Sequence, residues 1–171
     1  MGIISLAAFM LMAITGLLLI WKKNSSGYLL ADTRQGTGTL AKEWVSIDSL
    51  QKSAIGYLSI RIPGEDSTID RIDVRPGKGV AKVTFKNHYT AIQVDLTTGL
   101  PLHMETRRAD FIEHLHDGSL FDDLAGTGFM KLLYGSLTGL MLIFLSVSGF
   151  FLWYNPKKIR KIKFNKISED R

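Results

Sequence analysis

The sequence predicts an α+β domain, with one helix on an antiparallel meander of about four strands, placed between two transmembrane α-helices. Residues 3–21 and 132–154 contain no charged residue. At about 1.5 Å per residue, each is long enough to cross a hydrocarbon core of about 30 Å. Between them the spacing of apolar residues changes from helical to alternating, which indicates a helix followed by strands.

The chain divides by composition into segments of different character. Residues 24–40 are rich in Gly, Ser and Thr, which is typical of a linker. The predicted segments are a first transmembrane helix (1–23), the linker (24–40), the α+β domain (41–108), a membrane-proximal segment (109–128), a second transmembrane helix (129–154) and a basic tail (155–171).

The first apolar segment has two interpretations, a cleaved signal peptide or a retained anchor. No basic residue precedes it, and the sequence WKKNSS that follows offers no small-x-small cleavage site. We therefore expect a retained anchor.

One amphipathic helix opens the central domain. Ser46 is a suitable N-cap, and apolar residues follow at helical spacing on one stripe. That stripe comprises Ile47, Leu50, Ala54, Tyr57 and Leu58.

Four short β-rich runs follow the helix. They are separated by the sequences PGKG, KNH and TTG, which are typical of turns. The predicted strands are residues 69–75, 81–85, 90–96 and 100–107.

The residues that follow the second apolar segment account for the whole net charge of +5. Basic and acidic residues balance, fourteen of each, between Lys22 and Lys131, whereas seven basic and two acidic residues follow Tyr154. This distribution does not support nucleic-acid binding. It favours contact with lipid headgroups, worth about 1 kcal/mol per basic residue near the surface. The expected contact residues are Lys157, Lys158, Arg160, Lys161 and Lys163.

The same basic tail predicts the topology. Basic residues close to a membrane end favour the cytoplasmic side, so the C-terminus is expected in the cytoplasm. With two spans, the N-terminus is expected there too, and the central domain lies outside the cytoplasm. The chain has no cysteine, so this domain has neither disulfides nor thiolate ligands.

Small residues indicate where the two spans pack. Gly135 and Gly139 form a GxxxG pattern, which lets helices approach closely. Aligned at an offset of 133 positions, Gly16 matches Gly149. We expect these glycines to pack the two spans against each other, and a homodimer through the same pattern is the alternative.

The stretch RRADFIEHLHDGSLF, residues 107–121, places two histidines among acidic groups just before the second span. If it is helical, His114 and His116 point about 200° apart and cannot hold one ion together. If it is extended, they point the same way, and a metal pair with Glu113 or Asp117 nearby becomes feasible. A third interpretation is a polar shoulder in which residues 117–119 form the turn that starts the next segment.

The order of these pieces resembles the PepSY-associated transmembrane family of bacterial inner-membrane proteins. The resemblance rests on "AIQVDLTTGLPL", then "RRADFIEHLHDGS", then a span closing in "SGFFLWYNPKK", and it covers nearly the whole chain. His116, Asp117, Gly118 and Ser119 match the HDGS-like motif of this family. Thr15-Gly16 and Ser148-Gly149 match its span endings. The resemblance implies an extracytoplasmic PepSY module anchored in the inner membrane, in agreement with the topology that the basic tail predicts.

The family resemblance also implies a redox alternative. Some larger members resemble iron-uptake-linked reductases that hold haem b between histidines of several spans. Here His116 is the first candidate ligand for haem or a transition metal, and His114 is the second. Members usually carry a histidine in a basic stretch ahead of the first span. In the alignment of the two spans, Gly2 of this sequence matches Gly135, so the given sequence does not include that stretch. The other axial ligand would then come from His114, His103, a second protomer or a partner protein.

No catalytic pattern stands out in the sequence, and the absence of CxxCH excludes covalent c-type haem. We expect His88 and His103 to lie on the solvated surface. The sequence does not support an enzyme by itself. It favours a binding or accessory module that recognises a periplasmic protein or peptide through its sheet. A haem b redox component linked to iron uptake, or a metal-binding membrane protein, is the alternative.

Overall fold

Both predicted spans are α-helices. The computed structural model describes the backbone of residues 2–169 and the side chains of residue 3 and residues 5–159. In it, two helical stretches are long and apolar enough to cross a membrane. The first, Ser5–Asn24, combines most of α1 (Gly2–Trp21) with the 3-10 turn η1 (Lys22–Asn24), and the second, Met130–Ile159, lies in α5 (Met130–Glu169). The helix α5 continues through Pro156, so residues 155–169 of the basic tail are helical.

Polar side chains within α5 bond to the backbone of their own helix. The hydroxyl of Thr138 donates to Tyr134 O at 2.6 Å, and that of Ser146 donates to Leu142 O at 2.8 Å. Ser148 bonds in the same way to Leu145 O at 3.1 Å. These hydroxyls therefore need no partner from another chain when lipid surrounds the helix.

The chain forms two compact units. One contains the residues up to Ile14 together with those from His114 onward, and the other contains Thr15–Glu113. The second unit includes more residues than the predicted domain of residues 41–108, because the segment before Ala41 is folded with that domain. The boundary predicted after residue 108 falls in the first turn of α3 (Arg108–Asp117).

The second unit contains the predicted antiparallel meander. Its strands lie in the order β1-β2-β3-β4 and pair with their sequence neighbours. They are β1 (Ile69–Arg75), β2 (Val80–Phe85), β3 (Thr90–Asp95) and β4 (Pro101–Thr106). The predicted fold class and strands are confirmed. A short 3-10 turn, η3 (Pro76–Lys78), joins β1 to β2 and ends at Gly79 in the left-handed region, where glycine has no steric penalty.

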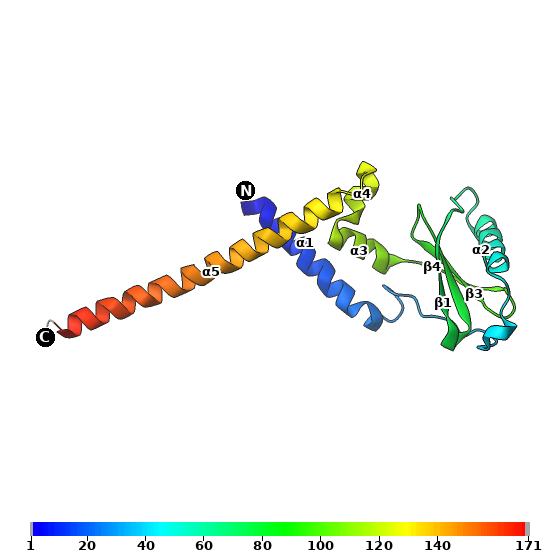
Figure 1. The fold of residues 1–171 in the computed structure, drawn as a ribbon, viewed down its shortest axis with the longest axis horizontal. Coiled ribbons are helices and arrows are strands. Elements are labelled where there is room, and N and C mark those ends of the chain that lie inside the picture. The colour runs from blue at the N-terminus through cyan, green and yellow to red at the C-terminus, as the bar shows by residue number, and fades with distance from the viewer. Residues whose placement is uncertain (1, 170–171) are drawn as a thin grey trace. The chain divides into compact units, whose positions relative to one another are not determined.

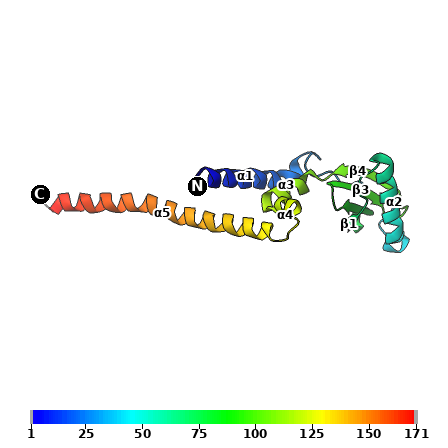
Figure 2. The same cartoon turned by 90° about the horizontal axis from the view of Figure 1, so that it is seen from above.

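One face of the sheet is covered by α2 (Ile47–Arg61), which lies beside the sheet in both Figure 1 and Figure 2. The Ser46 hydroxyl accepts a hydrogen bond from Ser49 N–H at 3.2 Å, so the predicted N-cap is confirmed. Ile47, predicted on the buried stripe, is instead 64 % exposed, because the first helical turn extends past the buried contact. The core comprises Leu50, Ala54 and Leu58 of the helix with Ala81, Val83, Phe85, Ile92, Val94 and Leu96 of the sheet region.

The opposite face of the sheet is polar, and its residues on β2 and β3, together with Glu105 on β4, are buried too. We call residues 29–38 the strap, because their backbone is held across this face. Arg34 N–H donates to Gln93 Oε1 at 2.8 Å, and Thr37 N–H donates to Asp95 Oδ2 at 2.8 Å. In return, Gln93 Nε2 donates to Asp32 O at 3.1 Å. Part of the predicted linker therefore belongs to the folded domain.

Two glycines let the strap approach the sheet closely. A Cβ on Gly36 would lie 2.2 Å from Gly79 O, and a Cβ on Gly79 would lie 2.1 Å from Gly38 O. Gly36 N–H also donates to Lys78 O at 2.8 Å. Larger residues at these positions would push the strap away from its hydrogen-bond partners on β3.

We expect Leu58→Ala to lower the free energy of unfolding of the sheet domain by about 2–5 kcal/mol, because it leaves a cavity between α2 and the sheet. The matched control is Ile60→Ala on the exposed side of the same helix, which should change it by less than about 0.5 kcal/mol. Urea unfolding of the full-length protein in detergent, followed by tryptophan fluorescence, measures both. Equal losses in the two variants would contradict the core described here.

Candidate functional site

The two candidate ligand histidines lie on a helix. Since α3 is helical over Arg108–Asp117, the extended interpretation of this stretch is wrong, and the backbone does not provide the geometry that the His-x-His pair required. A ligand role for His116 or His114 stays a prediction. His114 and His116 are two positions apart and point about 200° from each other. Among the described residues, no group of three or more His, Cys, Asp or Glu side chains could hold a metal ion.

The residues after His116 form a tight elbow between α3 and α4 (Ser119–Ala125). Asp117 ends the first helix, Gly118 adopts φ +82°, and Ser119 begins the second. Ser119 N–H donates to Asp117 Oδ1 at 2.9 Å. The turn that the sequence predicted for residues 117–119 is confirmed, and it accounts for the aspartate, glycine and serine of the HDGS-like motif in structural terms.

The elbow is fastened to the beginning of α5. The Asp117 carboxylate pairs with the Lys131 ammonium, and Asp122 Oδ1 accepts from Lys131 N–H at 3.1 Å. Burial raises the pKa of the Asp117 carboxyl, but Lys131 and the hydrogen bonds from Ser119 outweigh burial, so the pKa lies below its ordinary value. Asp117 is therefore an anion at neutral pH, and it holds the elbow rather than carrying a proton.

A pocket of about 520 Å³ lies beside the elbow. Its apolar and small wall residues come from both spans, and its polar rim comes from the end of α3 and the start of α5. The lining residues are Met12, His116, Asp117, Lys131, Leu132, Gly135 and Ser136. His116 is the one histidine among them. His114 is not in the lining, and its Nδ1 lies 3.4 Å from Asp123 Oδ2.

This lining does not fit haem b held between two histidines of one chain. A six-coordinate b-type centre of this kind needs an axial imidazole on each side of the porphyrin. His116 supplies one, and the described residues that line the pocket supply no second imidazole. A bis-histidine site would therefore need an imidazole from outside this lining.

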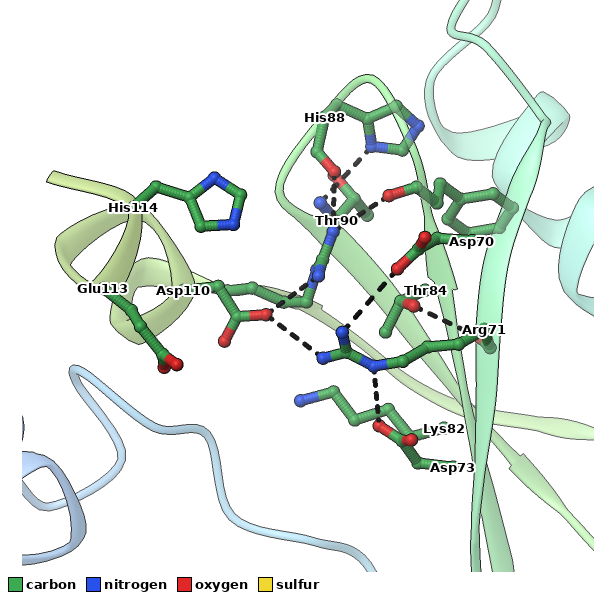
Figure 3. A network of polar contacts seen from close by, with 12 residues as sticks. Asp70, Arg71, Asp73, Lys82, Thr84, His88, Thr90, Asp110, Glu113 and His114 are labelled. Atoms are coloured by element: carbon green, nitrogen blue, oxygen red, sulfur yellow. Dashed lines mark hydrogen bonds and ion pairs between the residues drawn. The ribbon is translucent and has the colours of Figure 1, made fainter. Parts of the chain in front are cut away.

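A second group of charged residues ties the start of α3 to the sheet. Asp110 Oδ2 lies 2.8 Å from Arg107 Nη1 and 3.6 Å from Arg71 Nη2. Arg71 also contacts Asp73, through Nε at 3.3 Å, and Asp70, at 3.7 Å, and Figure 3 shows its guanidinium among these three carboxylates. No local sequence pattern predicts this group, because three of its members lie on β1 and the other two, Arg107 and Asp110, lie at the junction of β4 and α3, far along the chain.

Arg107 is nearly fully buried where β4 meets α3. Its Nη2 donates to Phe85 O at 2.9 Å and to His88 O at 3.0 Å, which holds the loop between β2 and β3. Its Nε is buried without a hydrogen-bond partner. Removing Asp110 would leave this guanidinium underpaired in a buried position, which is costly.

The buried polar face of the sheet was also missed. The Lys82 ammonium and Gln93 amide both contact the carboxylate of Glu105, and all three residues are less than 9 % exposed. Asp95 accepts from the backbone N–H of Thr37, Thr97 and Thr98. Burial raises the pKa of Asp95, but these hydrogen bonds outweigh it and lower the pKa. In the sequence these residues alternate with apolar ones, as on a solvated face.

The other two histidines differ in their surroundings. His88 is half-buried, its ring stacks on Phe85 at 5.3 Å between centroids, and its Nε2 lies 2.8 Å from Asp66 O. The prediction that it is solvated is therefore wrong, because the loop folds its ring onto the core edge. His103 is half-buried on β4, opposite Gln93, so it too is not a freely solvated side chain.

Three of the four glycines predicted for helix packing have no neighbouring atom close to the position of a Cβ. A Cβ added to Gly135, Gly139 or Gly149 would meet nothing within 4 Å. A contact between the spans does exist at Ser5, whose hydroxyl lies 3.8 Å from Met141 Sδ. The packing role of Gly16 and of these glycines stays a prediction.

The basic tail is described in part. Lys157 lies over the Trp153 ring, with its Nζ 3.5 Å from the ring centroid, and Lys158 is exposed. The side chains of Arg160, Lys161 and Lys163 lie outside the described residues. Lipid contact by these residues stays a prediction.

Comparisons with known proteins agree with the order of these elements. A family model described as "PepSY-associated TM region" matches residues 1–170, which is nearly the full length of the chain. No curated protein and no solved structure matches the chain.

We expect Gly118→Ala to lower Tm more than Gly126→Ala. Both glycines have positive φ, which alone costs an alanine about 1–2 kcal/mol. A Cβ on Gly118 would also lie 2.6 Å from Tyr134 Cδ1, whereas one on Gly126 would meet nothing within 4 Å. Thermal unfolding of the full-length variants in detergent separates the two costs. Equal shifts would mean that the Tyr134 contact does not constrain the elbow.

Proposed function

Because this chain belongs to the PepSY-associated TM region family, we propose that it is a membrane-anchored binding module whose sheet domain recognises a protein or peptide. Its two apolar helices and its family support a location in a membrane. The described residues present no catalytic set, and the polar clusters described above serve to hold the strap, the elbow and α3.

The observation that carries this proposal is that both faces of the sheet are occupied by the chain itself. The apolar face packs against α2, and the polar face bonds to the strap. Within residues 2–169, no further strand pairs with β1 or β4. The backbone edges of these strands are therefore the parts of the sheet available to another chain, and addition of an extended strand is a common mode of peptide recognition.

The two edges differ in what they offer. The strand β4 begins with Pro101, which has no N–H to donate, and its pairing with β3 shifts register between Gln93 and Val94. The strand β1 contains no proline, and its single irregularity lies at its start, between Ile69 and Arg71. We propose β1 as the principal edge for recognition.

We further propose that the domain faces the periplasm and that both termini lie in the cytoplasm. The concentration of basic residues after Tyr154 supports this orientation, because such residues are retained on the cytoplasmic side. In this orientation the tail contacts anionic lipid headgroups of the inner leaflet through residues that include Lys157 and Lys158.

The alternative function, a haem b component linked to iron uptake, has one observation in its favour. His116 lines a pocket of about 520 Å³ whose walls come from both spans. The single histidine in that lining counts against a complete site in one chain, so this function would require a ligand from a second protomer or another protein. We place it second.

To test the binding proposal, a photoreactive amino acid is placed at Val74 on β1 or at Leu102 on β4, and membranes are irradiated. Both side chains are exposed and adjoin the open edges. We expect crosslinks to a polypeptide from these positions. The control is Ile60, which is more exposed but lies on α2. Crosslinks from Ile60 alone, or from none of the three, would contradict recognition through the sheet edges.

The haem alternative is tested by an absorbance spectrum of the protein purified in mild detergent after haem-replete expression. With one histidine at the pocket, we expect no Soret band and no sharp bands after dithionite reduction. A Soret band that disappears in His116→Ala and persists in His114→Ala would reverse the order of the two proposed functions.

A further inference from the structure

We infer that β1 pairs with β1 of a second copy of this chain, antiparallel and centred on Ile72. The two sheets then form one continuous sheet of two meanders related by a two-fold axis. This inference rests on the proposed function, because it names the partner of the open β1 edge. It is carried by the sequence of the strand, its exposure and the charges around Arg71.

The strand β1 is suited to edge pairing along most of its length. From Arg71 to Arg75 its register with β2 is regular, and it contains no proline. Four of its seven residues are exposed, including Val74 at 42 %. An edge strand of this kind presents a row of backbone N–H and C=O groups to another strand.

The sequence IDRIDVR is complementary to itself when two copies run antiparallel about Ile72. Ile72 then faces Ile72 of the second copy, and Arg71 faces Asp73 twice, once on each side of the axis. Asp70 faces Val74, and Ile69 faces Arg75. Opposite charges directly across a strand pair stabilise it, and no like charges face each other in this register.

Neighbouring registers lack this complementarity. In a continuous sheet with both α2 helices on one side, two residues that face each other across the strand pair point to the same face of the sheet. The two-fold axis must therefore pass beside a residue and not between two residues, so the alternative registers are centred on Arg71 or Asp73. Centring the pair on Arg71 places Arg71 opposite itself. Centring it on Asp73 places Asp73 opposite itself and Arg71 opposite Arg75. Ile72 is thus the favoured centre among these three.

The charges around Arg71 favour the same arrangement. In one chain its guanidinium contacts three carboxylates, those of Asp70, Asp73 and Asp110 (Figure 3). Of these, Asp110 also pairs with a second arginine, Arg107. The side chains of Arg71 and Asp73 are 55 % and 44 % exposed. In the dimer each Arg71 faces Asp73 of the other copy, so each copy gains a cross-strand partner of opposite charge for both residues.

On the opposite face of the strand, pairing extends the hydrophobic core. Ile72 is half-buried and packs against the core cluster under α2. Contact with Ile72 of the second copy removes more of the apolar surface of Ile72 from water. The second strand also covers part of the exposed side chain of Val74. Anchoring both copies in one membrane also raises their effective concentration, so a short strand interface suffices.

Disulfide crosslinking tests the register, since the natural chain has no cysteine. Full-length Ile72→Cys and Val74→Cys variants are oxidised mildly in native membranes and separated on non-reducing gels. In the Ile72→Cys dimer the two thiols face each other within the reach of a disulfide, whereas in the Val74→Cys dimer they lie about 13 Å apart along the strand. We expect at least about fivefold more dimer from Ile72→Cys than from Val74→Cys. A mixture of Asp70→Cys and Val74→Cys chains should crosslink to each other.

A charge exchange provides a second measurement on the Ile72→Cys background. Arg71→Asp places like charges opposite each other and should reduce the dimer severalfold, and adding Asp73→Arg restores opposite charges and should recover it. Equal crosslinking of Ile72→Cys and Val74→Cys, or no recovery in the exchanged variant, would overturn the inference. If Ile72→Cys gives no dimer but photocrosslinks from Val74 reach another protein, the second copy is excluded while the proposed function stands. If neither edge forms a crosslink, both are overturned.

Discussion

The fold of the central domain depends on how a four-stranded sheet with one apolar and one polar face can bury both. The apolar face is covered in the ordinary way by α2. The polar face carries Lys82, Gln93, Asp95 and Glu105, and burying such groups is unfavourable unless every one is paired. The strap meets this requirement by offering backbone N–H and C=O groups to Gln93 and Asp95, while Lys82 and Glu105 pair with each other.

Paired polar groups also hold the junction between β4 and α3, where the chain leaves the sheet. Arg107 joins the end of β4 to the loop between β2 and β3, and Asp110 on α3 neutralises it. Farther along, the ion pair of Asp117 and Lys131 fastens the elbow between α3 and α4 to the start of α5. The acidic and basic residues of the membrane-proximal segment are therefore largely committed to holding helices in place. This explains why a stretch rich in potential ligands brings together no group of three or more His, Cys, Asp or Glu side chains around one point among the described residues.

The sequence was sufficient to predict the helix and the strands, because their apolar periods and turn residues are local signals. The turn at residues 117–119 was predictable for the same reason. The strap was not, because Gln93 and Asp95 grip backbone atoms of Arg34 and Thr37, and backbone contacts leave no side-chain pattern in the strap itself. The polar residues of β2, β3 and β4 alternate as they would on a solvated face. His88 was misjudged because its stacking on Phe85 depends on the tertiary position of a loop.

The way the strap is held has a consequence for how this region tolerates change. Most of its contacts to β3 use the main chain, and the Thr37 hydroxyl, which donates to Asp95 Oδ1 at 3.1 Å, is the side chain that also bonds there. Side chains elsewhere in the strap are therefore less constrained by β3 than its glycines and its length. A fragment excised at Ala41, where the regular elements begin, would leave the polar face of the sheet open to water. The folded unit thus starts upstream of the regular elements of the domain, and any fragment of it prepared for study in solution has to retain the strap.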